Sequence, residues 1–225
     1  MAEEQTIVGA TAEKREDAVT ADFLNLVRER SSIRHYDPNF KIEESEIREI
    51  LEAAALAPSS SNLQPWRFLV IQDQAAKQEL FPIAFSQQQV LDASAVIAVL
   101  ADKLAYKNAD RIYSGLVKLG AMNEDVKTKY VAGIHQNYGN LSETRSLKIA
   151  ATDGGLVSMQ LMLAAKAKGY DTVPMGGYDA DKFVEAFGVP ENYVPVMLIA
   201  IGKGVKASYP KTRLPLDEIL TWNKY

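Results

Sequence analysis

The chain has 225 residues with a formal net charge of −4, and its 47% hydrophobic and 24% charged residues are ordinary for a soluble globular protein. The acidic balance argues against a nucleic-acid-binding protein, because phosphate affinity is built from clustered Lys and Arg, and no such cluster is present. Without cysteine there is no disulfide framework or thiolate metal site, and two isolated histidines, His35 and His135, leave little for zinc.

The N-terminal segment over 1–17 is polar, charged and without clear periodicity, so we expect a mobile arm ahead of one domain over 18–225. This segment lacks the apolar core of a secretory signal. No apolar run of the sequence is long enough to span a bilayer. These features favour a cytoplasmic protein that does not insert into a membrane.

Two helices are predicted next. Thr20 caps a helix that ends near Arg30, in which apolar residues recur at i, i+3 and i+4. The second helix, over 43–57, has one apolar stripe and acidic residues in its first turn, where the helix dipole favours them.

Three apolar runs predict strands, over 66–72, 95–102 and 194–202. The second run is almost continuously apolar, as expected of a strand that is buried on both faces. A polar helix near 73–81 follows the first strand, and helical pieces interrupted by glycines form an excursion over 105–140. Strands that alternate with longer helices indicate a sheet wrapped by helices, of the α/β or α+β class.

The longest helical pattern covers 143–169 and is apolar on most sides. A helix of this kind is central to the fold or packs on a partner chain. Its internal glycines, Gly154 and Gly155, suggest a tight helix crossing, because each costs about 1 kcal/mol relative to Ala unless close packing compensates. The polar tail over 205–225 should lie on a surface, either of its own subunit or of another one.

Signatures of nucleophilic or metal chemistry are missing from the sequence: there is no G-x-S-x-G, no P-loop, no H-E-x-x-H and no G-x-G-x-x-G after a strand. With two histidines and no cysteine a catalytic triad is not expected, although an Asp or Glu base remains open. An enzyme-sized chain with so few acid–base groups often takes its chemistry from a cofactor.

The stretch "RERSSIRHYDP" is the first candidate for cofactor binding. Arg30 and Arg34 give two guanidinium groups four residues apart, with the hydroxyls of Ser31 and Ser32 between them. Arginine suits bidentate contacts with phosphate. The alternative is a solvated helix end whose arginines complement the helix dipole.

The second candidate is the short connection "APSSSNLQPW", which joins a predicted helix to a predicted strand. Ser59, Ser60 and Asn62 offer donors and acceptors without charge, which suits sugar hydroxyls or the ring carbonyls of a neutral heterocycle. The alternative is a turn in which these side chains bond to the local backbone.

The third candidate is "YPKTRLPLDEI", near the C-terminus. Lys211 and Arg213 lie on alternate residues, so in an extended segment their side chains point the same way. The alternative is a pair of surface charges.

Together with "LDASAVI" and "PMGGYD", these three stretches resemble the nitroreductase family of FMN-dependent NAD(P)H oxidoreductases, over about residues 20–220. The resemblance implies an α+β fold (an α/β sandwich) with a central sheet flanked by helices. It implies an intertwined homodimer that binds FMN at its interface. It also implies a ping-pong reaction in which hydride passes from NADH or NADPH through FMN N5 to flat small-molecule acceptors such as nitroaromatics or quinones.

The resemblance also assigns the site residues. The arginines and Ser32 of the first stretch would hold the FMN phosphate and ring edge, with Ser31 alongside. Lys211 and Arg213 would close on the phosphate from the C-terminal side. The second stretch, through Ser59, Ser60 and Asn62, would reach the FMN of the partner subunit. The isoalloxazine would lie along Pro174, Met175, Gly176 and Gly177.

The sequence departs from the family pattern at four places, one of which is Ser86, at a position that is often Asn in relatives. Many relatives carry an acidic residue where Gly176 stands, so we expect backbone alone to face the flavin N5. Gln89 stands where some relatives have Lys, and we expect it to bond the pyrimidine edge. The excursion over 105–140, which shapes the substrate pocket in the family, matches no family pattern, so the acceptor stays open. The alternatives are a flavin-dependent enone reductase or dehydrogenase on the same scaffold, and a flavin-binding protein without turnover.

Overall fold

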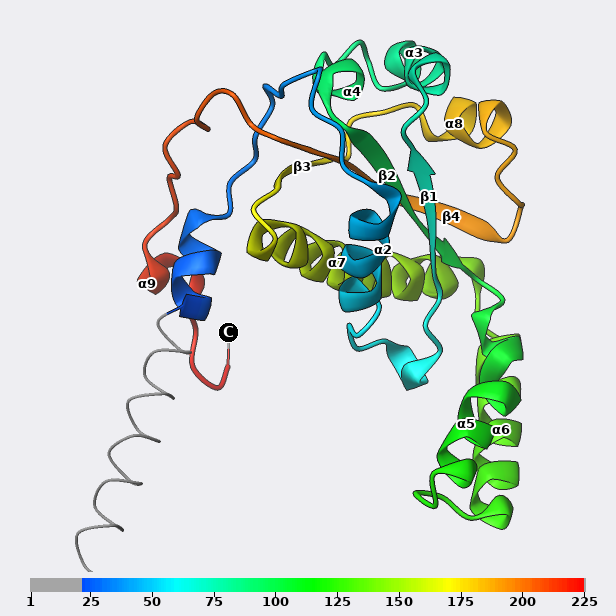
Figure 1. Ribbon diagram of the computed structural model, residues 1–225. Coiled ribbons are helices and arrows are strands. Elements are labelled where there is room, and N and C mark those ends of the chain that lie inside the picture. Colours follow the sequence, from blue (N-terminus) through cyan, green and yellow to red (C-terminus); the bar gives the residue numbers. More distant parts are fainter. Residues whose placement is uncertain (1–21, 225) are drawn as a thin grey trace, which may run out of the picture.

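The computed structural model describes residues 22–224, so the predicted arm over 1–17 and the Thr20 cap lie outside the described residues. Helices cover both faces of a twisted sheet, and a pair of helices extends away from one end of it (Figure 1). This arrangement confirms the predicted α+β fold. Within residues 22–224, no helix combines the length and the apolar character needed to cross a membrane.

The sheet has four strands in the order β1-β2-β4-β3, and every neighbouring pair is antiparallel. Their bounds are β1 Trp66–Ile71, β2 Ala95–Asp102, β3 Asp171–Met175 and β4 Tyr193–Gly202. Three of these strands are the predicted ones. All eight residues of β2 are buried, which confirms the prediction made from its apolar run. β3 was not predicted as a strand, because it is short and contains Pro174.

The predicted helices occur in the predicted order along the chain. The first described helix covers 22–29 and ends beside Arg30, as predicted. The others are α2 Glu44–Ala54, α3 Gln74–Ile83, α4 Gln89–Asp92, α5 Ala109–Lys118, α6 Glu124–Gly139, α7 Glu143–Ala167, α8 Ala180–Ala186 and α9 Leu216–Ile219, with two short 3-10 helices, η1 Ser60–Asn62 and η2 Ala105–Asn108. Helices α4, α8 and α9 were not predicted. Side chains cap four of the helices: Asp73 for α3, Asn123 for α6, Ser142 for α7 and Asp179 for α8.

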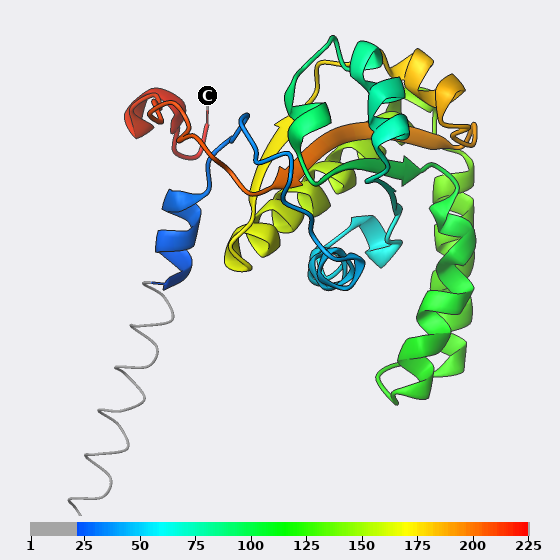
Figure 2. The ribbon, with the colours of Figure 1, turned by 45° about the horizontal axis from the view of Figure 1, so that its top comes forward.

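Two hydrophobic cores lie on opposite faces of the sheet. Because successive side chains of a strand point to opposite faces, β2 contributes alternate residues to each core. Val96 and Ala98 pack with α3 and α8, whereas Ile97 and Val99 pack with α2 and α7. A third cluster, which includes Leu63 and Tyr113, lies between η1 and the hairpin formed by α5 and α6. The predicted excursion over 105–140 is thus an ordered helical hairpin that projects from the body (Figures 1 and 2).

Helix α7 approaches the sheet closely at Gly154. A Cβ atom on Gly154 would lie 2.7 Å from Cγ2 and 2.8 Å from Cγ1 of Val196 on β4. A Cβ atom on Gly155 would meet nothing within 4 Å. Within the single chain, the close packing at Gly154 is therefore between a helix and the sheet, and the predicted crossing of two helices stays a prediction for a contact between chains.

Candidate functional site

The two ends of the described chain converge on a group of basic side chains. The ammonium of Lys211 donates a hydrogen bond to the backbone oxygen of Arg28. Desolvation lowers the pKa of Lys211 below its ordinary value, and the nearby positive charges of Arg30, Arg213 and Lys166 lower the pKa further. We call these four side chains, Arg30, Lys166, Lys211 and Arg213, the basic cluster. The carboxylate of Glu29 acts on the pKa of Lys211 in the opposite direction. Because ammonium and guanidinium groups form charge-assisted hydrogen bonds with phosphate, the basic cluster is a candidate phosphate site.

Lys166 is the member of the basic cluster that the sequence analysis missed. It lies in the last turn of α7, where a basic residue is also explained by the helix dipole. The Nζ of Lys166 lies 3.3 Å from the carboxylate of Asp171, and this ion pair connects Lys166 to the start of β3.

The "RSSIR" segment continues from the first helix as extended chain alongside β3. Ser32 forms a parallel bridge with Thr172, and the backbone N–H of Ile33 donates to the oxygen of Thr172 at 3.0 Å. The hydroxyl of Ser31 donates to the backbone at Glu29, at 3.2 Å. Arg34 is exposed. This segment therefore holds the predicted phosphate-binding residues at the β3 edge of the sheet.

The predicted ring-contacting residues meet where β3 ends. The buried Gln89 amide lies 3.4 Å from Sδ of Met175 and donates to the side chain of Gln87 at 2.9 Å. Gln87 in turn donates to the backbone oxygen of Gly177 at 2.8 Å. Gly176 and Gly177 are exposed, so their backbone is open to a flat ligand. Gln87 was not predicted, because it lies in a run of three glutamines that gives no positional signal.

The "PSSSN" connection forms the 3-10 helix η1 in an unusual backbone conformation. Ser61, Asn62 and Gln64 have φ angles of 48°, 50° and 49°, in the left-handed region that favours glycine. Each such residue costs of the order of 1–3 kcal/mol and persists only where its surroundings hold it in place. The side chains of Asn62 and Gln64 are exposed. Backbone strain of this kind gathers at ligand-binding sites, which fits the predicted role of this turn.

The serines of this turn make bonds within the protein. The hydroxyl of Ser59 accepts from the backbone N–H of Gln64 at 3.0 Å, as the alternative of a locally bonded turn predicts. Ser60 instead donates, from both N–H and hydroxyl, to the carboxylate of Asp153 on α7, at 3.1 Å and 3.0 Å. Asn62 keeps an exposed amide. Asp153 was not among the predicted site residues.

The η1 turn and the basic cluster lie far apart in one chain. In Figures 1 and 2 η1 lies on the hairpin side of the sheet, whereas the tail with α9 lies beside residues 22–29 at the opposite side. A single chain therefore does not bring Ser59, Ser60 and Asn62 to the phosphate site. A ligand that uses both groups of residues needs two copies of the chain.

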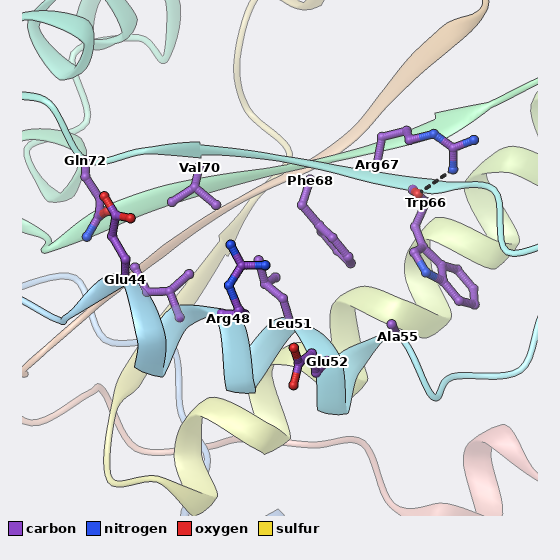
Figure 3. Close-up of a pocket in the computed structure, with 11 residues that line it drawn as sticks. Glu44, Arg48, Leu51, Glu52, Ala55, Trp66, Arg67, Phe68, Val70 and Gln72 are labelled. Carbon is purple, nitrogen blue, oxygen red and sulfur yellow. Dashed lines mark hydrogen bonds between the residues drawn. The ribbon is translucent and has the colours of Figure 1, made fainter.

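Two further grooves contain none of the phosphate-binding residues. A groove of about 630 Å³ follows the outer edge of β1, where Arg48 and Leu51 of α2 face Phe68 of β1 (Figure 3). A second groove, of about 790 Å³, crosses the outer face of α7 and is lined by apolar residues that include Phe23 and Met159.

The comparisons with known proteins identify the family. The model of the nitroreductase family matches residues 27–203, most of the chain. The chain belongs to the nitroreductase family. The resemblance inferred from "PSSSNLQPW" and the neighbouring motifs is thereby confirmed.

Individual nitroreductase-family relatives match along nearly their whole length. YdgI of Bacillus subtilis, named provisionally as an NAD(P)H nitroreductase, is 49% identical over 205 residues, covering 90% of this chain and 98% of that protein. The CLA biosynthesis enone reductase of Lactiplantibacillus plantarum is 32% identical over 206 residues, covering 90% and 94%. The crystal structure of an Exiguobacterium sibiricum protein in complex with FMN is 49% identical, with a TM-score of 0.85 over 89% of this chain and 97% of that one.

Proposed function

We propose that this protein binds FMN and passes electrons from NADH or NADPH to flat small-molecule acceptors. The observation that carries this proposal is the basic cluster, because Lys211 of the C-terminal segment bonds to the backbone of Arg28 and is influenced by the charges of Arg30 and Arg213. The FMN held by the Exiguobacterium sibiricum relative supports the choice of ligand.

Each group of residues has a role in this proposal. The basic cluster binds the phosphate, because charge-assisted hydrogen bonds to phosphate are strong. Gln89 and the backbone after Met175 would orient the ring, and the exposed backbone of Gly176 would be available to donate to it. FMN held by these residues would supply the hydride-transfer chemistry between the nicotinamide and the acceptor. No protein nucleophile is required, which fits a chain without cysteine.

The reductant and the acceptor should use one slot over the ring in turn. We therefore expect ping-pong kinetics, with parallel lines in double-reciprocal plots. Anaerobic stopped-flow reduction of the bound flavin by NADH and by NADPH, followed by reoxidation with a nitroarene or a quinone, tests the two half-reactions separately. Intersecting lines would contradict a shared slot. A flavin band that neither nicotinamide bleaches would instead support a binding protein without turnover.

A second candidate activity is the reduction of enones on the same scaffold. It is favoured by the 32% identity to the CLA biosynthesis enone reductase. Product analysis with a nitroarene, a quinone and an enone under the same reductant separates the two activities.

We also propose that the protein is an intertwined homodimer in the cytoplasm. The outer face of α7 exposes Leu156 and Met159 by 43% and 39%, and the tail exposes Trp222 by 79%. Apolar surfaces of this extent are typical of contacts between chains. A dimer would also bring the η1 turn of one subunit to the cofactor held by the other. Light scattering that gives a monomer of 24.8 kDa with full flavin occupancy would contradict it.

A further inference from the structure

The carboxylate of Asp153 is buried without a cationic partner. Asp153 lies in the middle of α7, and its residue is 2% exposed. Among the ion pairs between residues 22 and 224, none includes Asp153. Burying a charge in this way is costly unless hydrogen bonds compensate. Among the described residues, its carboxylate accepts hydrogen bonds from Ser60 alone, at the start of η1.

Asp153 acts on η1 as a cap supplied from a distant helix. The first N–H groups of a helix have no partner within it, so they need an acceptor from elsewhere. The flanking residue, Ser59, makes no such cap, because its hydroxyl accepts from Gln64 instead. Asp153 fills that role across 93 residues of sequence.

The next residue of the turn, Ser61, is held by the α5–α6 hairpin. The hydroxyl of Tyr113, on α5, donates to the backbone oxygen of Ser61 at 2.8 Å. The hydroxyl of Tyr138, on α6, lies 3.0 Å from the hydroxyl of Ser61. Burial, reinforced by the neighbouring Tyr130, raises the pKa of Tyr113 to about 12.

These bonds divide the turn into a fixed half and an open half. Ser60 and Ser61 are tied to α7 and to the α5–α6 hairpin. Asn62 and Gln64, which share the left-handed conformation, present exposed side chains. The anchors therefore hold a strained backbone whose exposed side chains, Asn62 and Gln64, bond within residues 22–224 only to each other: the Gln64 amide donates to Oδ1 of Asn62 at 3.3 Å.

We propose that Asp153 is a positioning residue, which fixes the Ser59–Asn62 turn for its contact with the flavin of a second subunit, with Tyr113 and Tyr138 as its counterpart on the hairpin. This proposal rests on the proposed function. Because Tyr113 and Tyr138 hold the same turn, the α5–α6 hairpin would also affect how the cofactor is bound.

The test compares Asp153→Ala with Val157→Ala, which lies one helical turn further along α7. Val157 is fully buried in the core and does not bond to η1, so its truncation lowers stability without releasing the turn. Two quantities are measured: the dissociation constant of FMN, and amide hydrogen exchange at residues 60–64 in the protein freed of flavin. Tyr113→Phe and Tyr138→Phe remove the hairpin anchors one at a time.

We expect Asp153→Ala to raise the dissociation constant of FMN by about tenfold or more and to speed exchange at residues 60–64 by a similar factor, because it removes bonds to a charged group. Val157→Ala should leave both values within about twofold of wild type. If Asp153→Ala does not fold, Asp153→Asn and Ser60→Ala each remove part of the same cap and should show the same direction of change.

The outcomes separate this proposal from the proposed function. Wild-type protein that does not bind FMN would refute the proposed function, while exchange at residues 60–64 would still report whether Asp153 fixes the turn. Wild-type protein that binds FMN, with an Asp153 variant that binds as tightly and exchanges no faster than Val157→Ala, would overturn the positioning role.

Discussion

Replacing Gly154 by alanine should destabilise the protein, although alanine normally stabilises a helix by about 1 kcal/mol relative to glycine. The new Cβ would lie 2.7–3.0 Å from three side-chain atoms of Val196, well inside the roughly 3.5–4.0 Å of ordinary carbon contacts. Valine is stiff at χ1, so it cannot turn aside without strain. Relief requires α7 to move away from β4. Overpacking of this kind costs about 1–3 kcal/mol.

Gly133→Ala in α6 is the matched control, because a Cβ there would meet nothing within 4 Å. Both variants gain the same helix propensity, so their difference isolates the overpacking. For a chain of this size 1 kcal/mol shifts Tm by about 2–4 °C, so Gly154→Ala should melt roughly 2–12 °C below Gly133→Ala. Thermal unfolding followed by circular dichroism measures this. Equal melting temperatures, or a higher one for Gly154→Ala, would refute the close approach of α7 to β4.

Three further predictions concern the site. Arg30→Ala and Arg213→Ala should each purify folded but largely without flavin, since the loss of one charge-assisted hydrogen bond raises the dissociation constant of FMN by about 10- to 150-fold. Equilibrium dialysis measures this dissociation constant. Variants that keep stoichiometric FMN after dialysis would show that these charges do not bind the phosphate. Riboflavin, which lacks the phosphate, should bind the wild-type protein weakly, and the same substitutions should not change its affinity. If they lower the affinity for riboflavin as much as that for FMN, the arginines do not act through the phosphate. Burial raises the pKa of Asp153, although the hydrogen bonds from Ser60 oppose this shift. The folded state therefore holds the proton more tightly than the unfolded chain does. This difference stabilises the folded state below about pH 4, and the stabilisation is lost as the pH rises through the raised pKa. Asp153→Asn removes this dependence, so its Tm relative to wild type should increase from pH 4 to pH 7, and a constant or decreasing difference would contradict the raised pKa.

The apolar pattern of the sequence was sufficient to predict the helices and strands in which that pattern is strongest. The unbroken apolar run of β2 and the long apolar pattern of α7 both follow from side chains that must be buried on several sides. β3 escaped prediction because Pro174 argues against a strand. The structure resolves the conflict by placing β3 at an edge of the sheet, where a missing N–H is tolerated.

The sequence predicts those candidate site residues whose chemical type indicates their role. It does not predict residues whose role depends on a contact with a distant part of the chain. The cations at residues 30, 211 and 213 were found from their chemistry and their place in the family motifs. Asp153 was not, because a single carboxylate within an apolar helix gives no sign that its partner lies 93 residues earlier. The left-handed backbone at Ser61 and Asn62 was equally hidden, since neither residue is glycine.

The strand order has a consequence for how the chain folds as it is synthesised. β4, the last strand to be made, lies between β2 and β3, and its pairing with β2 joins Asp102 to Tyr193. At about 5–20 residues per second, the ribosome takes roughly 5–20 s to cover the residues between them. Throughout that interval one edge of the apolar β2 has no neighbour. An unpaired strand edge is a template for pairing with other chains, and β4 covers this edge of β2 once it has been made.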